Sequence, residues 1–100
     1  MNFGLDENTI KYINDIFKKY PQIDKAIIYG SRATGTSRYN SDIDLVLIGD
    51  LNWDFSGHIH EELDSLPTPY LFDVRDYSNI ENPELKSEIE QQGKLLYQRV

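Results

Sequence analysis

The sequence predicts an α/β fold of the α+β kind, in which helices pack on a small mixed β-sheet. Amphipathic segments alternate along the chain with short runs of β-branched and aromatic residues, which is the pattern of helices and strands that share one core. Hydrophobic residues make up 39% and charged residues 27% of the sequence, the balance of a folded globular protein. Because 100 residues cannot supply two stable cores, we expect a single domain over residues 1–100.

The first expected element is an amphipathic helix over residues 6–20. Its isoleucines and Phe17 recur at helical spacing, while polar and charged residues occupy the other side. Pro21 ends this helix, because proline cannot continue the helical hydrogen bonding. The run Ile23–Tyr29 is rich in isoleucine and predicts a buried strand, which Gly30 stops.

The middle of the chain predicts two more strands. After a polar, glycine-containing segment that begins with a short helical turn, residues 41–48 form the second strand. Residues 50–56 are predicted as a loop and residues 58–66 as a short helix, which Pro67 ends. A third strand follows over residues 70–77.

The C-terminal part predicts one more helix. Asn82 is a favourable N-cap, Pro83 is a favourable first helical residue, and Gly93 marks the end. The pattern leaves open the type of the last short element, residues 94–100. The expected order is therefore helix, strand, short helix, strand, helix, strand, helix and this last element.

Two neighbouring polar motifs carry the chemistry, Gly30–Gly35 and Ser41–Leu45. A glycine after a buried strand, followed by a serine that opens a helical turn, lets backbone N–H groups and the Ser31 hydroxyl converge on a phosphate. Residues two apart in a strand share a face, so Asp42 and Asp44 present paired carboxylates. A divalent cation would screen their repulsion, and oxygen ligands suit Mg²⁺ or Mn²⁺ rather than zinc. A metal site beside a phosphate cradle suggests phosphoryl or nucleotidyl transfer.

This combination of Gly-Ser and a following Asp-x-Asp resembles the signature of the DNA polymerase β-type nucleotidyltransferase superfamily, with every position filled. The segments Phe72–Val74 and Asn82–Leu85 extend the similarity to very short bacterial members, the minimal nucleotidyltransferases (MNT). Those occur beside a HEPN-domain protein as two-component or toxin–antitoxin pairs. The resemblance implies a polymerase β-like core and an adenylyltransferase that uses ATP and Mg²⁺ to modify a hydroxyl, such as a tyrosine, of a HEPN partner in a hetero-oligomer.

The resemblance also implies a two-metal site. Asp42 and Asp44 would bridge two Mg²⁺ ions, with Mn²⁺ as an alternative, and Asp73 would hold the ion nearer the attacking hydroxyl. Asp73 is also the candidate general base. Gly30 and Ser31 would grip the triphosphate.

A competing candidate exists for the third carboxylate. Asp76 would share a strand face with Phe72, whereas Asp73 would share one with Arg75, and this weak distinction leaves the choice of Asp73 to the family match. The structural alternative for Asp73 is an ion pair with Arg75.

The remaining candidate residues are polar or aromatic. Ser41 completes the expected nucleotide-binding set, and Arg32 and Arg38 are further candidates for phosphate contact, with ordinary surface exposure as the alternative. Trp53 and Phe55 fall in the predicted loop, where a contact with the core is the commoner role for an aromatic ring than stacking on a base.

The composition restricts partners and location. A net charge of −7 argues against general binding to nucleic acid or to anionic membranes. No apolar run approaches the roughly 20 residues that span a bilayer, no secretory pattern opens the chain, and cysteine is absent, so we expect a cytoplasmic protein. Larger superfamily members carry further domains, so we also expect a partner to complete the site.

Two other functions stay open. The chain could be a noncatalytic antitoxin or regulatory subunit that neutralises its partner by binding, or it could adenylylate a small hydroxyl compound such as an aminoglycoside. No motif identifies the NTP, the acceptor, the number of nucleotides transferred or the stoichiometry of a complex.

Overall fold

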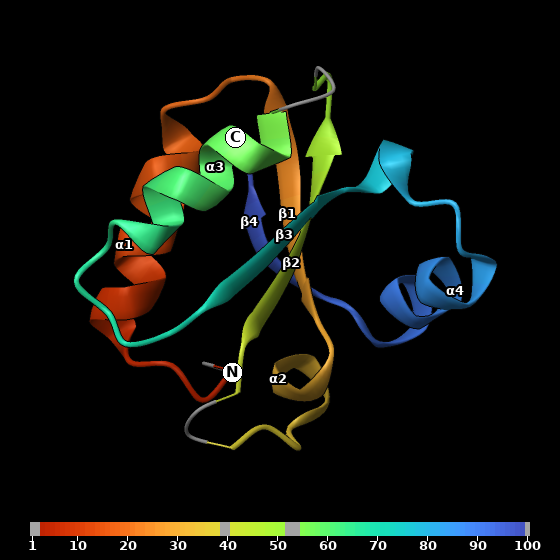
Figure 1. Ribbon diagram of the computed structural model, residues 1–100, viewed down its shortest axis with the longest axis horizontal. Coiled ribbons are helices and arrows are strands. Elements are labelled where there is room, and N and C mark those ends of the chain that lie inside the picture. Colours follow the sequence, from red (N-terminus) through yellow and green to blue (C-terminus); the bar gives the residue numbers. More distant parts are fainter. Residues whose placement is uncertain (1–2, 39–40, 52–54, 100) are drawn as a thin grey trace.

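The computed structural model describes residues 3–38, 41–51 and 55–99, which build a four-stranded mixed sheet (Figure 1). The sheet order is β3-β2-β1-β4. Its strands are β1 (Ile23–Tyr29), β2 (Ile43–Gly49), β3 (Phe72–Asp76) and β4 (Lys94–Gln98). β1 is antiparallel to β2 and β4, whereas β2 and β3 are parallel. The predicted fold class is confirmed.

Helices lie on both faces of the sheet (Figure 1). α1 (Glu7–Lys18) and α3 (Phe55–Asp64) pack on one face, here called the α1/α3 face, and α4 (Pro83–Gln92) packs on the other, the α4 face. α2 (Ser31–Thr34) is one helical turn directly after β1, and the 3-10 turn η1 (Tyr77–Asn79) follows β3.

Amphipathic spacing explains α1. Ile13, Ile16 and Phe17 are buried and repeat every three to four residues, so they form one apolar stripe against the sheet. Asp6 stands before the helix and accepts a hydrogen bond from the Thr9 hydroxyl. The predicted helix is therefore confirmed, with ends slightly inside the expected ones.

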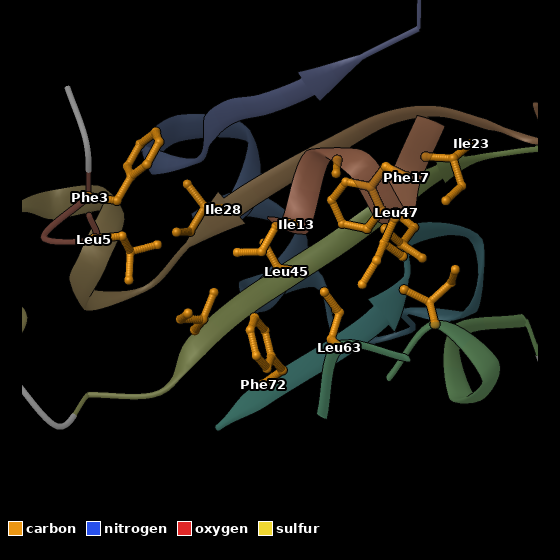
Figure 2. Close-up of a cluster of buried hydrophobic side chains, with 14 of the residues drawn as sticks. Phe3, Leu5, Ile13, Phe17, Ile23, Ile28, Leu45, Leu47, Leu63 and Phe72 are labelled. Atoms are coloured by element: carbon orange, nitrogen blue, oxygen red, sulfur yellow. The ribbon is translucent and has the colours of Figure 1, made fainter. Parts of the chain in front are cut away.

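The alternation of side chains along the strands divides the interior into two clusters. On β2, Leu45 and Leu47 belong to the main core under α1 and α3, which Figure 2 shows, whereas Val46 belongs to a smaller cluster under α4. The smaller cluster also contains Tyr29, Ile80 and Ile89. Asp44 has the same parity as Val46 and so lies on the α4 face.

The element predictions need correction or completion at four points. α3 begins at Phe55 rather than at residue 58, because the Phe55 ring is buried and packs edge-on against Tyr20. The undetermined C-terminal element contains a strand, β4, and the sequence did not predict η1. β2 begins at Ile43, so Asp42 precedes the strand.

The prediction for Trp53 lies outside the described residues. Within the described ranges, no helix is both long and apolar enough to cross a membrane.

Candidate active site

The turn after β1 brings the backbone close to the first carboxylate. Gly30 has φ 75° and ψ −153°, a conformation that side chains other than glycine rarely adopt. A Cβ atom added at Gly30 would lie 2.6 Å from Asp44 Oδ2. Ser31 opens α2, and the Gly30 carbonyl accepts hydrogen bonds from Ala33 and Thr34. Glycine is therefore required here both for the turn and for the approach to Asp44.

Three aspartates converge at the same end of the sheet. Asp44 on β2 is in register with Asp73 on β3 and stands opposite Tyr29 on β1. Burial raises the pKa of Asp44, and the negative charges of Asp73, Asp42 and Glu88 raise it further. Asp42 and Asp73, the other two candidate metal ligands predicted from the sequence, thus lie near enough to Asp44 for their charges to act on it.

This excess of negative charge fits a divalent cation, and its carboxylate oxygens are the ligands that Mg²⁺ and Mn²⁺ prefer. In the described parts of the chain, however, no three acidic or histidine side chains are already gathered in a cluster that could hold an ion. Arg75 Nε instead lies 3.3 Å from Asp73 Oδ2. The donor chemistry fits an ion, but the side chains must reorient to bind one.

Tyr29 and Arg75 are neighbours of the aspartates to which the sequence analysis gave no functional role. Arg75 donates a hydrogen bond to Asp73, and the charge of Asp73, followed by that of Tyr29, raises the pKa of Arg75. Burial, and then the charge of Asp73, raises the pKa of Tyr29 to about 12. Strand parity could have found both residues, because each lies on the same sheet face as the aspartates.

Arg32 does not match the phosphate contact predicted for it. Its side chain is 2% exposed, and its guanidinium donates to the backbone carbonyls of Ser41 and Phe3 at 2.8–3.2 Å. The guanidinium carbon also lies 5.0 Å from the centre of the Tyr70 ring. Arg32 therefore ties the N-terminal segment and the segment before β2 to α2.

Arg38 and Ser41 bracket the segment that leads into Asp42. The Arg38 N–H donates to the Ser41 hydroxyl at 2.8 Å, and the Ser41 N–H donates to the Arg38 carbonyl at 3.0 Å. The Arg38 side chain is exposed. Ser41 thus holds the backbone of Arg38, and the predicted nucleotide contacts of both residues stay predictions.

Asp76, the competing third carboxylate, has a different setting. It is 5% exposed and accepts hydrogen bonds from the backbone N–H and the hydroxyl of Ser78, at 3.0 and 2.8 Å. It therefore caps η1, whereas Asp73 is the residue in register with Asp44. The role of Asp73 as a metal ligand stays a prediction.

Comparison with known proteins decides the family. Residues 11–100 match the family model described as polymerase beta, nucleotidyltransferase. The chain belongs to this nucleotidyltransferase family. All of the candidate site residues of this polymerase β-type chain lie within the matched region.

Individual relatives agree with this family. The protein named "Putative protein adenylyltransferase" of Methanocaldococcus jannaschii is 38% identical over 52 residues, which cover 50% of this chain and 52% of that protein. The chain therefore spans about half the length of this curated relative.

Two solved structures share the nucleotidyltransferase fold. A toxin–antitoxin crystal structure with AMP-PNP has a TM-score of 0.72 and 25% identity, with 95% of this chain and 75% of that chain covered. A structure of tri-AMPylated Shewanella oneidensis HEPN toxin in complex with MNT antitoxin has a TM-score of 0.69 and 17% identity, with 95% and 74% covered. At that identity, the second likeness shows the fold alone.

Proposed function

We propose that this chain is an Mg²⁺-dependent adenylyltransferase that transfers AMP from ATP to a hydroxyl group of a HEPN-type partner protein, and that it thereby acts as an antitoxin. The observation that carries the proposal is the convergence of Asp42, Asp44 and Asp73 beside the Gly30–Ser31 turn. A nucleotidyltransferase needs both parts, because the triphosphate must be held while its negative charge is neutralised.

The chain's own residues divide the work by position. The N–H groups and hydroxyl of the Gly30–Ser31 turn would bind the triphosphate. Asp42, Asp44 and Asp73 would hold two Mg²⁺ ions, which when bound would neutralise the charge that develops on the phosphates. In the transfer, the acceptor oxygen bonds to the α-phosphorus, the bond from that phosphorus to the bridging oxygen of the β-phosphate breaks, and pyrophosphate leaves. Asp73 would accept the proton of the acceptor hydroxyl.

The nucleotide and the partner are suggested by similar proteins. AMP-PNP, an ATP analogue, is present in one similar toxin–antitoxin structure, and the curated relative is named an adenylyltransferase. The partner in the Shewanella structure is an AMPylated HEPN toxin. The sequence resemblance to minimal nucleotidyltransferases points to the same type of partner for this chain.

One observation favours a second function. Asp73 is paired with Arg75, and the described acidic side chains are not gathered around an ion position. A chain that kept this arrangement permanently would neutralise its partner by binding alone. The two functions differ in one requirement, because only the enzyme needs the aspartates to be charged ligands.

The deciding experiment is the intact mass of the protein encoded by the neighbouring gene after incubation with this chain, ATP and Mg²⁺. We expect a gain of one or more AMP units with the wild type and with Asp15→Asn, an exposed position on α1, and no gain with Asp44→Asn. A gain that survives Asp44→Asn would contradict the proposed site. No gain with the wild type, in a complex that still forms, would favour neutralisation by binding.

A further inference from the structure

Two leucines are exposed at opposite edges of the sheet. Leu71 directly precedes β3 and is 67% exposed, and Leu95 on β4 is 52% exposed. The Leu71 carbonyl accepts a hydrogen bond from the Ile43 N–H at 2.9 Å, so its backbone continues the pairing of β3 with β2. An exposed leucine does not contribute to the hydrophobic core, which leaves the Leu71 side chain without a structural role.

Leu71 lies on the sheet face that carries the aspartates. Its neighbours Tyr70 and Phe72 both pack into the main core on the α1/α3 face. Because side chains alternate along an extended segment, Leu71 points to the opposite face, which it shares with Asp73 two residues later. An apolar side chain therefore stands at the solvent-exposed rim of the candidate active site.

The sheet order assigns this rim to the acceptor, provided that the proposed adenylyl transfer is correct. The Gly30–Ser31 turn follows β1, Asp44 is on the central strand β2, and Asp73 is on the edge strand β3. The attacking and leaving oxygens lie roughly in line through the phosphorus. If pyrophosphate leaves on the β1 side, the acceptor hydroxyl must approach from the β3 side, where Leu71 stands.

The charge of the same region indicates what the acceptor carries. Asp42, Asp44 and Asp73 are joined there by Glu88 of α4, which is close enough to act on Asp44. Arg75 is the cation among them and is already paired with Asp73. A basic segment is attracted to such a surface, whereas an acidic segment is repelled.

We infer that Leu71 and the adjoining edge of β3 form the acceptor-docking surface of this chain, and that it takes a basic protein segment with an apolar residue next to the reactive hydroxyl. Leu71 contacts the apolar residue, the aspartates attract the basic ones, and Asp73 receives the hydroxyl.

The test uses the full chain with ATP, Mg²⁺ and three synthetic peptides that each carry serine, threonine and tyrosine. One peptide has leucine and lysine as neighbours of the hydroxyl residues, the second has leucine and glutamate, and the third has glycine and lysine. The rate of AMP addition is followed by peptide mass, for the wild type and for Leu71→Ser and Leu95→Ser. Binding of AMP-PNP is measured for all three proteins.

We expect the wild type and Leu95→Ser to prefer the leucine–lysine peptide. Leu71→Ser should slow that reaction by about fivefold or more, the size of a modest hot spot, and should lose the preference for leucine over glycine. AMP-PNP binding should be the same in all three. Equal losses in the two variants, or no preference for lysine, would overturn the inference.

Three further outcomes separate the inference from the proposed function. Weaker AMP-PNP binding in Leu71→Ser would place Leu71 against the nucleotide and overturn the docking surface alone. Transfer to the neighbouring-gene protein but to no peptide would also overturn the docking surface alone. Absence of both transfers from a folded wild type would contradict the adenylyltransferase itself.

Discussion

The two faces of one sheet differ in the charge that they carry, and β2 shows this within four residues. Leu45 and Leu47 point to the α1/α3 face, where both are fully buried. Asp44 and Val46 point to the α4 face, where Asp44 is surrounded by other carboxylates. The first face supplies the apolar burial that stabilises the fold, and the second tolerates repulsion between like charges. Stability and chemistry are therefore separated by the two-residue period of a strand.

The largest expected effect is on AMP transfer, and it follows from a substitution of Asp44 on the α4 face. Under the proposed mechanism, Asp44→Asn should lower transfer by roughly 10³-fold or more, about 4 kcal/mol, because Asp44 would hold the ions that neutralise the phosphates. The same change should raise the melting temperature of the metal-free protein at pH 7, because the raised pKa of Asp44 means that ionisation destabilises the fold. Thermal unfolding in EDTA measures the second effect. A lower melting temperature of Asp44→Asn than of the wild type would show that repulsion between carboxylates does not destabilise the α4 face.

The next largest effect is expected on the free energy of unfolding, from a substitution on the α1/α3 face. Phe17 is 0% exposed and packs against the Tyr97 ring at 5.5 Å between centroids. Phe17→Ala should lower the free energy of unfolding by about 3–5 kcal/mol, because it leaves a cavity in the main core. Tyr12→Ala, on the exposed side of the same helix, should change it by less than about 0.5 kcal/mol. Urea unfolding followed by circular dichroism compares them, and similar losses would contradict the division between the faces.

The success of the sequence predictions differs between elements with a clear local pattern and elements that depend on distant contacts. The elements of the α1/α3 face were predictable because α1 shows clear helical periodicity and β1 is a run rich in isoleucine, and β1 has the bounds expected. The start of α3 was missed, because residues 50–56 show no helical pattern and the packing of Phe55 involves Tyr20, which is distant in the sequence. β4 was left open, because a short C-terminal strand depends on its pairing with β1 rather than on local pattern.

The candidate site was predictable in its residues more than in its contacts. The motif located Asp42 and Asp44, and the parallel register then brought Asp73 beside Asp44. The role of Arg32 could not be predicted, because its side chain points into the interior. The pairing of Arg75 with Asp73, in contrast, was one of the two alternatives that the sequence offered for Asp73. Local sequence does not show which arginine has backbone carbonyls within reach.

A smaller effect concerns the helix that covers the α4 face. Asn82 Oδ1 accepts hydrogen bonds from the N–H groups of Glu84 at 2.9 Å and Leu85 at 3.4 Å, and so caps α4. Asn82→Ala should lower the free energy of unfolding by about 1 kcal/mol, and Asn82→Ser, which keeps a capping oxygen, should retain most of that stability. Amide exchange should become faster in α4 than in α1, because Ile89 holds α4 to the smaller cluster. Equal acceleration in both helices would indicate that the two faces unfold together.

The smallest expected effect is on the free energy of unfolding, and its sign is opposite to that of the substitution at Asp44. Glu62 on α3 accepts hydrogen bonds from Lys19 and Tyr20 beyond the end of α1, and those bonds, Lys19 first, lower the pKa of Glu62. Ionised Glu62 therefore stabilises the fold above the ordinary pKa of a glutamate, and this stabilisation is lost as the pH falls through the lowered value.

Because the Lys19–Glu62 pair is near the surface, Glu62→Gln should cost less than about 1 kcal/mol at pH 7, and the difference from the wild type should shrink at pH 3. Glu61→Gln, an exposed neighbour, is the control. The stability difference between Asp44→Asn and the wild type should also shrink at low pH, since protonation relieves the repulsion at Asp44. At pH 7, however, this difference should have the opposite sign, because Asp44→Asn is the more stable protein. If Glu62→Gln and Asp44→Asn changed the free energy of unfolding in the same direction at pH 7, the two faces would not differ in their response to a carboxylate charge.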